Sequence, residues 1–463
     1  MTIYLHNSLT RQTEEFKPID PKNVTFYTCG PTVYFYQHIG NFRTFAMADF
    51  LHRTLLFNGL KVSYIMNFTD VGHLTGDNFG DADTGEDRLE KAAEKEGRSA
   101  KEIANYYIQD FTQSYEALNL KKPKKFTRAT EYIQEQIELV RSLEQKGFTY
   151  QISDGIYFDT SKYSAYGLLS GMSKESIKEG ARVEPNPEKL NASDFALWKF
   201  SPADKTRWQE WDSPWGVGFP GWHVECSAMA MKELGVTLDL HMGGEDHKMI
   251  HHPNEIAQSE CATGQRFVNT WLHVAFLQVD GGKMGKSLGN GYTLDDIKHK
   301  GFDPLALRYF YMNAHYRTNQ NFTWDAMQHS QNALNKLYDI VGSYKEEKNA
   351  LPDKQILERF KDSLNADLNV PKALSIMWEL VKSTTSDPVK VATLVKMDEV
   401  LGFNISDHIG YEVPVSVIDM ARTRYEYRKS GIWEKADLVR KAIEAEGFVV
   451  EDVAGSFKLK RKN

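Results

Sequence analysis

The chain has 463 residues, of which 41% are hydrophobic and 26% charged, the balance of an ordinary globular protein. Its 56 Lys and Arg against 63 Asp and Glu give a net charge of −7, which excludes a generally polybasic DNA-coating protein. The three cysteines, Cys29, Cys226 and Cys261, are too far apart in sequence to indicate a disulfide framework. The N-terminus lacks an apolar signal segment, and no later stretch reaches the roughly 20 apolar residues of a membrane span. We therefore expect a soluble, reduced, cytoplasmic protein with no membrane partner.

The first part of the chain has the pattern of a strand–helix–strand unit. Residues 24–29 and 62–68 are short apolar runs that predict strands. Between them, apolar residues recur with helical spacing from Asn41 until the stop signal Asn58-Gly59. We expect this helix to begin just after His38-Ile39-Gly40, where free N–H groups and the positive end of the dipole suit a phosphate. The same pattern also fits a parallel-sheet crossover that binds no ligand.

The rest of the chain divides into regions of different character. Residues 70–87 predict a Gly- and Asp-rich loop, and residues 90–118 and 129–146 predict two helical regions. A strand within an insertion is predicted at residues 155–159, and a block of short apolar runs at residues 208–288. Long amphipathic helices are predicted at residues 326–344, 354–364 and 370–382. This change of character predicts a domain boundary near Asp325, and a weaker one is expected at residues 406–413.

Two motifs carry residue types that suit a polyphosphate. His38-Ile39-Gly40-Asn41 stands at the expected helix start, where an imidazole can bind phosphate oxygens and glycine allows close backbone approach. Lys283-Met284-Gly285-Lys286-Ser287 places two lysines among glycines, which predicts a cationic loop able to close on phosphates. Each motif alone also has an ordinary explanation, a chance His-x-Gly or a solvated turn. Their occurrence together in a split nucleotide-binding fold favours polyphosphate binding over these ordinary explanations.

Four further side chains have the composition of a metal site. Cys29 ends the first predicted strand, and Cys226 is distant from it in sequence. His251 and Glu255 lie four residues apart at an expected helix start. Two thiolates, one imidazole and one carboxylate satisfy a tetrahedral Zn²⁺. Taken singly, the cysteines also fit small buried apolar positions, and Glu255 fits the dipole of its helix.

These motifs and the segments around them resemble one family. The two phosphate motifs are similar to the HIGH and KMSKS motifs of class I aminoacyl-tRNA synthetases. The segments that resemble cysteinyl-tRNA synthetases in particular are residues 27–34, 67–70, 221–229 and 251–259. Asn41 replaces the second histidine of the first motif, and Gly285 replaces the first serine of the second. Neither departure removes a lysine, and the resemblance extends over nearly the whole chain.

The resemblance implies an α/β fold. It consists of a Rossmann-type catalytic domain with an insertion, an α-helical bundle and a small C-terminal anticodon-binding domain. We expect the first half of the catalytic domain at residues 1–110, the insertion at 111–200, and the second half, with the metal site and the lysine loop, at 201–288. A stem-contact region is expected at residues 289–325, the bundle at 326–406 and the anticodon domain at 407–463.

The resemblance also implies the reaction, which is activation of L-cysteine by ATP to cysteinyl-adenylate and transfer to tRNA(Cys). The catalytic residues are then His38, Asn41, Lys283 and Lys286. The ATP-binding residues are His38, Gly40, Asn41, Gly243, Gly244, Asp246, Lys283, Lys286 and Ser287. Mg²⁺ is expected to accompany ATP, and a monomer is expected.

Selection of cysteine is implied to depend on one Zn²⁺ per subunit. The metal ligands are then Cys29, Cys226, His251 and Glu255, and the cysteine-binding residues are Gly30, Thr69, Trp222 and His241. Zinc favours a thiol strongly over the serine hydroxyl, whereas an apolar pocket separates such close analogues poorly. Trp222 and His241 also fit core packing, but the nearby ligand set favours the pocket.

The C-terminal residues suit an RNA partner despite the negative total charge. Residues 421–463 contain eleven basic and seven acidic side chains, and aromatic residues alternate with the basic ones. Arg422, Arg424, Arg428 and Trp433 are the expected tRNA contacts, because such a mixture binds backbone and stacks unpaired bases. A solvated helix face would have the same composition.

Two other functions remain open at this stage. One is a mycothiol-type cysteine ligase that transfers cysteine to an amino sugar; the 138 residues after Asp325 and their basic end argue against it. The other is a catalytically silent, tRNA-binding paralogue. The presence of His38, Lys283 and Lys286 argues against that.

Overall fold

The computed structural model describes residues 2–72, 87–171, 186–202, 207–285, 289–345, 347, 349–410, 413–453 and 456–461. Its centre is a sheet of five parallel strands in the order β11-β10-β3-β4-β5. These are β3 (Val24–Thr28), β4 (Val62–Phe68), β5 (Lys125–Arg128), β10 (Leu238–Gly244) and β11 (Val268–Val274). Most side chains of β3, β4 and β10 are buried, as expected for a parallel sheet covered on both faces. The predicted α/β fold with a Rossmann-type sheet is confirmed.

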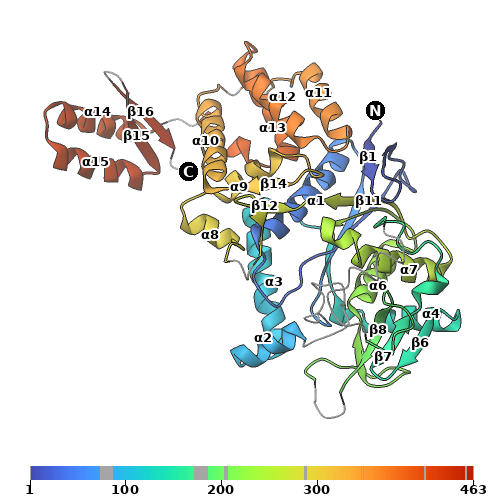
Figure 1. Ribbon diagram of the computed structural model, residues 1–463. Helices are drawn as coiled ribbons and strands as arrows, with labels where there is room; N and C mark the ends of the chain where they lie inside the picture. The colour runs from blue at the N-terminus through green and yellow to red at the C-terminus, as the bar shows by residue number, and fades with distance from the viewer. Residues whose placement is uncertain are drawn as a thin grey trace. The chain divides into compact units, whose positions relative to one another are not determined.

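Three helices position the ends of these strands (Figure 1). Helix α1 (Ile39–Phe57) follows β3 and contacts β4 and β10. Helices α6 (Trp222–Leu234) and α7 (His251–Thr263) pack against each other, and α6 also contacts β3 and β4. Helix α1 begins at Ile39, two residues earlier than expected, because the His38 side chain caps its first turn. It ends before Asn58, as the stop signal predicted, because the chain then turns at Gly59 with a φ of 82°. The single helical region expected at residues 90–118 is two helices, α2 (Arg88–Glu96) and α3 (Ala100–Ala117), because Gly97 ends the first with a φ of 64°.

An insertion separates the two halves of the sheet in sequence. Its strands form an antiparallel sheet in the order β6-β7-β8-β9, with bounds β6 (Thr149–Ile152), β7 (Gly155–Phe158), β8 (Phe195–Phe200) and β9 (Gly218–Pro220). Helix α4 (Ile133–Gln145) covers it through a cluster that includes Ile137, Leu143 and Phe158. Cys261 lies in the same cluster, so it is a packing cysteine.

The remaining elements that the structure describes are two small sheets, four short turns, the later helices and a C-terminal hairpin. A hairpin is formed by β1 (Tyr4–Asn7) and β2 (Gln12–Glu15), and a three-stranded sheet by β12 (Leu277–Val279), β13 (Gly282–Lys283) and β14 (Gln320–Phe322). The short turns are η2 (Ala129–Glu131), η3 (Thr160–Lys162), η4 (Glu245–Lys248) and η6 (Ile405–His408). The later helices are α8 (Leu294–His299), α9 (Pro304–Met312), α10 (Trp324–Val341), α11 (Lys354–Asn365), α12 (Val370–Lys382), α13 (Asp387–Leu401), α14 (Val415–Lys429) and α15 (Trp433–Ala445), followed by the hairpin β15 (Phe448–Val453) and β16 (Ser456–Arg461).

The chain forms two compact units. One comprises residues 1–331, 358–376 and 399–401, and the other residues 332–357, 377–398 and 402–463. In the second unit, α14 and α15 pack side by side and against the β15–β16 hairpin around Val417, Ala421, Ile443, Phe448 and Val450. The domain limits expected from the sequence remain a prediction.

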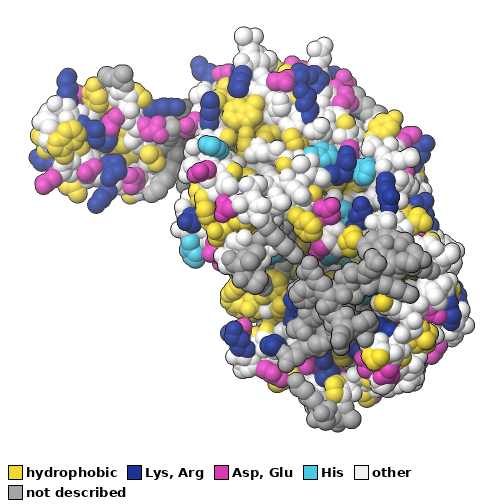
Figure 2. Space-filling view, in the orientation of Figure 1, with side chains coloured by type: hydrophobic (Ala, Val, Ile, Leu, Met, Phe, Trp, Pro, Cys, Tyr) yellow, Lys and Arg dark blue, Asp and Glu magenta, His cyan; other side chains and the backbone are white. Residues whose placement is uncertain are grey.

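The surface agrees with the composition. Basic and acidic side chains are interspersed over the face shown in Figure 2, in keeping with a net charge of −7. Among the described residues, no helix has both the length and the apolar character that crossing a bilayer requires.

Candidate functional site

The direction in which the chain builds the sheet reverses between β3 and β10. From this pair the chain proceeds outward in both directions, to β4 and β5 on one side and to β11 on the other. In open parallel sheets, ligands bind at such a reversal, beyond the carboxyl ends of the strands. Cys29 and Gly30 follow β3, and Gly243 and Gly244 end β10, so several predicted site residues meet at this edge.

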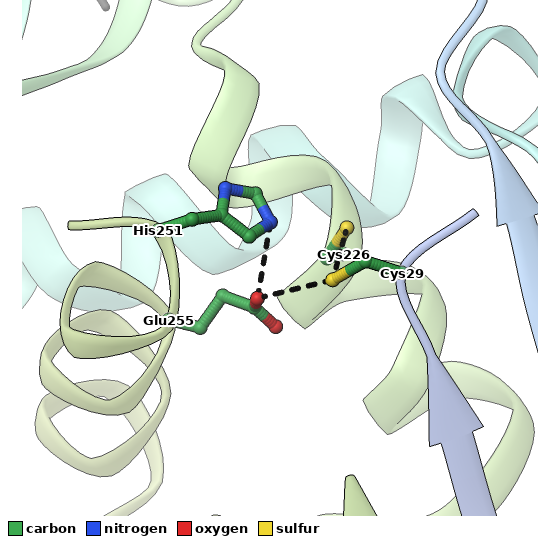
Figure 3. A group of neighbouring side chains, drawn as sticks. All are labelled: Cys29, Cys226, His251 and Glu255. Atoms are coloured by element: carbon green, nitrogen blue, oxygen red, sulfur yellow. Dashed lines mark hydrogen bonds and ion pairs between the residues drawn. The ribbon is translucent and has the colours of Figure 1, made fainter. Parts of the chain in front are cut away.

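The four predicted metal ligands lie together near this edge (Figure 3). Cys29 comes from the end of β3 and Cys226 from α6, while His251 and Glu255 share one face of α7 because they are four residues apart. Their side chains point toward one another, and all four are buried. One ligand atom from each residue lies within 4.8 Å of those of the others, so the group could hold a metal ion.

The distances within this group are close to those of a tetrahedral site. Sγ of Cys29 lies 3.8 Å from Sγ of Cys226 and 3.6 Å from Oε1 of Glu255. Nε2 of His251 lies 3.1 Å from the same Oε1. Bonds of about 2.3 Å to sulfur and about 2.0–2.1 Å to nitrogen or oxygen imply ligand separations of roughly 3.3–3.8 Å around a tetrahedral zinc.

A second, overlapping group of ligands shares two of these residues. Cys29, His241, His252 and Glu255 also have one ligand atom each within 4.8 Å of the others. Nε2 of His241 lies 3.1 Å from Oε2 of Glu255, and Nε2 of His252 lies 3.5 Å from Sγ of Cys29. The first group offers two sulfur donors and the second only one, so the first is better matched to zinc.

Hydrogen bonds behind the ligands fix their orientation. Nδ1 of His252 bonds to Nε2 of His273 at 2.8 Å, and Nδ1 of His273 bonds to Oγ of Ser8 at 2.8 Å. Nδ1 of His251 meets Nδ1 of His223 at 2.9 Å. Sequence reasoning missed His223, His252 and His273 as site residues; the only signal was their position within or near the family-like segments. Such outer contacts hold metal-ligand rings in place.

The buried charges in the cluster stabilise one another. Burial raises the pKa of the Glu255 carboxyl, but the neighbouring His241 and His251 rings outweigh this and hold that pKa well below its usual range. Burial lowers the pKa of His251, but the Glu255 carboxylate and the hydrogen bond with Cys226 outweigh it and raise that pKa to about 10. Burial raises the pKa of the Cys29 thiol, whereas a hydrogen bond from Cys29 lowers the pKa of Cys226. Metal binding to this group would therefore release protons.

The predicted cysteine-binding residues surround the same cluster. The backbone N–H of Gly30 donates to Oδ1 of Asn67 at 2.9 Å, and a Cβ at Gly30 would lie 1.6 Å from the Asn67 carbonyl oxygen, so only glycine fits. Nδ2 of Asn67 donates to Oγ1 of Thr69 at 3.2 Å, and Sγ of Cys226 lies 3.7 Å from Oδ1 of Asn67. Asn67 thus joins the predicted pocket to the metal ligands, a role that the sequence did not reveal.

Two aromatic contacts join the predicted cysteine-binding residues to this cluster. The ring of Trp222 lies 4.4 Å from that of His251 between centroids, and His241 stacks on Trp271 at 4.6 Å. Trp222 is half-buried, whereas His241 is fully buried. The structure therefore brings Gly30, Thr69, Trp222 and His241 together around the candidate metal site.

The first phosphate motif forms a capping box at the start of α1. Nδ1 of His38 accepts a hydrogen bond from the Asn41 N–H at 3.1 Å, and Oδ1 of Asn41 accepts one from the His38 N–H at 3.3 Å. Asparagine in place of the family's second histidine is thus accommodated by this cap. Because Nδ1 is the acceptor, the proton of the neutral His38 ring lies on Nε2.

The second motif approaches the first at Gly40. A Cβ at Gly40 would lie 3.2 Å from Sδ of Met284, and the Ile39 N–H donates to the Tyr292 carbonyl at 2.8 Å. The backbone of Lys283 belongs to β13, whereas Lys286 and Ser287 lie outside the described residues. Segments on both sides of the lysine loop therefore contact the helix start.

Two glycines at the end of β10 lie where any side chain would collide with a neighbouring residue. A Cβ at Gly243 would meet Cε1 of His252 at 2.6 Å, and one at Gly244 would meet Oδ1 of Asp246 at 2.4 Å. Asp246 is exposed, with 63% of its side chain accessible. These predicted nucleotide contacts thus lie at or just after the carboxyl end of β10.

Arg43 connects α1 to the segments that flank the lysine loop. Its guanidinium is fully buried and donates to the carbonyl oxygens of Ala275, Phe276, His315 and Thr318, at 3.1, 3.2 and 2.7 Å for the last three. No carboxylate is within ion-pair distance of it among the described residues, and burial lowers its pKa to about 10. The sequence gave no signal for this contact.

The predicted RNA contacts in the second unit differ in exposure. Arg424 is buried and bonds to both carboxylate oxygens of Asp452, at 2.8 and 3.1 Å. Arg428 lies 5.1 Å from the ring centre of Trp433, which is 58% exposed. Arg422 is exposed and pairs with Asp419 at 3.3 Å. Arg422, Arg428 and Trp433 are therefore accessible to a partner, whereas Arg424 holds the hairpin to α14.

Comparison with known proteins assigns this arrangement to a family. The family model described as the class I (C) tRNA synthetase catalytic domain matches residues 15–332, more than half of the chain. Cysteine–tRNA ligase 1 of Burkholderia lata is 43% identical over 98% of this chain and 95% of its own length. Cysteine–tRNA ligase of Treponema denticola is 39% identical over 98% and 99%.

Solved structures support the fold independently. Methionyl-tRNA synthetase of Mycobacterium tuberculosis, in complex with methionyl-adenylate, matches with a TM-score of 0.57 at 16% identity over 82% of this chain and 90% of its own. The LeuRS–tRNA–LeuAMS complex of Agrobacterium radiobacter matches with a TM-score of 0.60 at 10% identity over 86% and 87%. From the family model and the near full-length relatives, the chain belongs to the cysteine–tRNA ligase family of class I aminoacyl-tRNA synthetases.

Proposed function

We propose that this chain activates L-cysteine with ATP to form cysteinyl-adenylate and transfers the cysteine to tRNA(Cys), in the cytoplasm where translation takes place. The observation that carries the proposal is the buried group of Cys29, Cys226, His251 and Glu255, which contacts β10 through His241, while α1 packs against the same strand. A metal site that prefers sulfur and a helix end suited to phosphate, both positioned by one sheet, are what selection and activation of cysteine require. Membership of the family supports the same reaction.

The first donor group fits Zn²⁺. It offers two sulfurs, one imidazole and one carboxylate, and its measured separations of 3.1–3.8 Å agree with tetrahedral coordination. When bound, zinc would supply a Lewis acid that prefers the substrate's sulfur to the oxygen of serine. Gly30, Thr69, Trp222 and His241 would then shape the pocket around the rest of the amino acid, and Asn67 would hold Gly30 against the metal ligands.

The residues at the helix start would stabilise charge on ATP. In the activation step, the carboxylate of cysteine attacks the α-phosphorus and pyrophosphate leaves, so negative charge grows on phosphate oxygens. Nε2 of His38 carries the proton needed to donate to such an oxygen, because the Asn41 N–H occupies Nδ1. Lys283 and Lys286 would bind the phosphates from the loop, with Ser287 and with Mg²⁺ accompanying ATP. Gly40, Gly243, Gly244 and Asp246 would contact the nucleotide.

The second unit would bind the tRNA. Arg422 and Arg428 would contact phosphates and Trp433 would stack an unpaired base, since all three are accessible. The buried Arg424 would preserve the hairpin that accompanies them. Monomers suffice for this scheme, because every residue that it uses comes from one chain.

Two assays test the function. Cysteine-dependent exchange of pyrophosphate into ATP is expected, and its absence would favour the silent paralogue. Charging of purified tRNA(Cys) is expected next. If exchange occurred but an amino sugar, rather than tRNA, received the cysteine, the mycothiol-type reaction would replace the proposal.

A further inference from the structure

A cluster of tyrosines that the proposed mechanism does not use is exposed beside α1. Tyr36 and Tyr106 are each 41% exposed, and Tyr107 is half-buried next to them. Tyr36 belongs to the segment that leads into α1, and the other two lie on α3. Figure 2 shows hydrophobic side chains gathered where Figure 1 places α3. Exposed aromatic side chains that gather in one place mark interaction sites more often than scattered ones do.

The three rings hold one another in a fixed arrangement. Their centroids are 5.1–6.1 Å apart and their planes meet at 71–83°, so each ring presents an edge to the next. The hydroxyl oxygens of Tyr36 and Tyr106 are 2.6 Å apart, within one hydrogen bond. The hydroxyl of Tyr107 bonds to Glu96 at 3.3 Å. The cluster, which we call the tyrosine platform, is therefore ordered before any partner arrives.

Arginines accompany the tyrosine platform. The guanidinium of Arg98 lies 5.4 Å from the ring centre of Tyr106 and pairs with Glu96 at 3.7 Å. That of Arg88 lies 5.6 Å from the ring centre of Tyr34, two residues before Tyr36 in the sequence. Aromatic rings together with arginines are the composition of surfaces that bind single-stranded nucleic acid. A hydrophobic protein partner would not require the cations.

The place of the tyrosine platform in the fold identifies the strand that would reach it. Tyr36 is two residues before His38, the helix cap proposed to meet ATP. On the other side, the segment after the lysine loop lies beside the same helix start, since His38 forms a β-bridge with Thr293 and the Ile39 N–H donates to the Tyr292 carbonyl at 2.8 Å. The tyrosine platform therefore leads into the helix start that this segment contacts, where the end of a tRNA must come to receive cysteine.

We propose that Tyr36, Tyr106 and Tyr107 form a stacking platform for the unpaired 3′ nucleotides of the tRNA substrate. This inference rests on the proposed function and adds a subsite to it. Bases at the unpaired end would stack on the exposed ring faces while Arg98 contacts the backbone. The platform would guide the 3′ end toward the adenylate and would take no part in forming it.

The test compares two forms of tRNA(Cys), one intact and one trimmed of its unpaired 3′ nucleotides. With parent protein, trimming is expected to weaken binding. Tyr106→Ala and Tyr36→Ala are each expected to weaken binding of intact tRNA roughly 5- to 100-fold, the range for loss of one stacked base. Neither is expected to change binding of trimmed tRNA or pyrophosphate exchange. Tyr106→Phe and Tyr36→Phe keep the ring and are expected to bind intact tRNA like the parent.

The control is Tyr4→Ala, since Tyr4 on β1 is 47% exposed but outside the tyrosine platform, and it should change nothing. Equal binding of intact tRNA by parent and Tyr106→Ala would overturn the proposal, as would equal losses for both tRNA forms. Loss of exchange, or a parent dimer that Tyr106→Ala dissociates, would also overturn it, since the tyrosines would then serve activation or a second copy of the chain. If the parent showed no exchange, the proposed function would fail, whereas the binding comparison would still decide whether the platform holds an RNA end.

Discussion

The charged groups of the metal cluster in the first unit are buried, whereas most of the predicted RNA-binding arginines in the second unit are accessible to solvent. Glu255 and His251 are fully buried, and each is held by at least two neighbouring polar groups. Arg422 is exposed and Arg428 is half-buried, and each pairs with an aspartate at the surface. A buried charge has one allowed position, so its loss leaves its partners unsatisfied. An exposed charge is screened by water and by dissolved salt, so its loss costs little. Substitutions should therefore have large, specific effects in the cluster and small, salt-dependent effects in the second unit.

The largest effect is expected from Cys226→Ser, which removes a sulfur donor from the cluster. The variant should lose its metal, and exchange with cysteine should fall by at least about 100-fold, more than the loss of an outer contact costs. Serine activation should improve relative to cysteine, because the sulfur-selective element is gone. Elemental analysis and exchange rates with both amino acids measure this.

Cys261→Ser is the matched control, since Cys261 is also buried but lies in the insertion core. It should keep the metal and the preference for cysteine. A metal-free Cys226→Ser that preferred cysteine as strongly as the parent would contradict the zinc account of selectivity.

The next effect concerns a buried charge outside the cluster. Arg43→Met should lower the free energy of unfolding by about 3 kcal/mol, because four carbonyl groups lose their charged donor in a buried place. Denaturant titration measures this. Arg422→Met is the exposed counterpart and should change stability little. Equal stabilities of the two variants would show that the buried and exposed arginines do not differ as argued.

A smaller effect separates the two overlapping donor groups. If zinc takes the first group, His252 is an outer contact and His252→Asn should reduce metal affinity roughly 10- to 100-fold without abolishing binding. Metal titration against a competing chelator measures the change. If His252→Asn lost the metal completely while Cys226→Ser kept it, the second group would be the binding site.

The smallest effects are expected in the second unit. Replacing Arg422 and Arg428 together by alanine should raise the KM for tRNA several-fold and reduce the slope of log affinity against log salt concentration by about 1 for each lost phosphate contact. Exchange should not change. Arg440→Ala, on the neighbouring helix α15, is a control with a similarly accessible side chain. A loss that did not depend on salt would show that these arginines act structurally.

The contrast also explains how much the sequence could predict. The parallel strands β3 and β4, the helix α1 to within two residues of its start, and the helices α10 to α12 followed from apolar spacing, which is local. The metal ligands are up to 226 positions apart, and only their family-like segments connected them. Spacing did not predict α13, because its apolar residues surround the helix instead of forming one stripe.

Contacts made by tertiary packing had no local signal. Arg43 reads as one polar residue in an apolar helix, yet its acceptors lie 232 to 275 positions away. The chain of hydrogen bonds from Ser8 through His273 to His252 likewise joins three distant segments. The exposure of Tyr36 and Tyr106 and the burial of Arg424 also depend on how helices and hairpins pack, so composition alone treated all arginines of the C-terminal region alike.

Because His38 both caps α1 and is proposed to meet ATP, fraying of the first turn of this helix should affect activation of cysteine. The ring proposed to meet ATP is also the cap of the first turn of α1, so fraying of that turn would release Nδ1 and let the ring rotate and change tautomer. Helix ends open at lower temperatures than the core of the protein unfolds. Activation of cysteine should therefore decline reversibly on warming before the fold is lost, and this early decline should be steeper in Asn41→Ala, which lacks half of the cap.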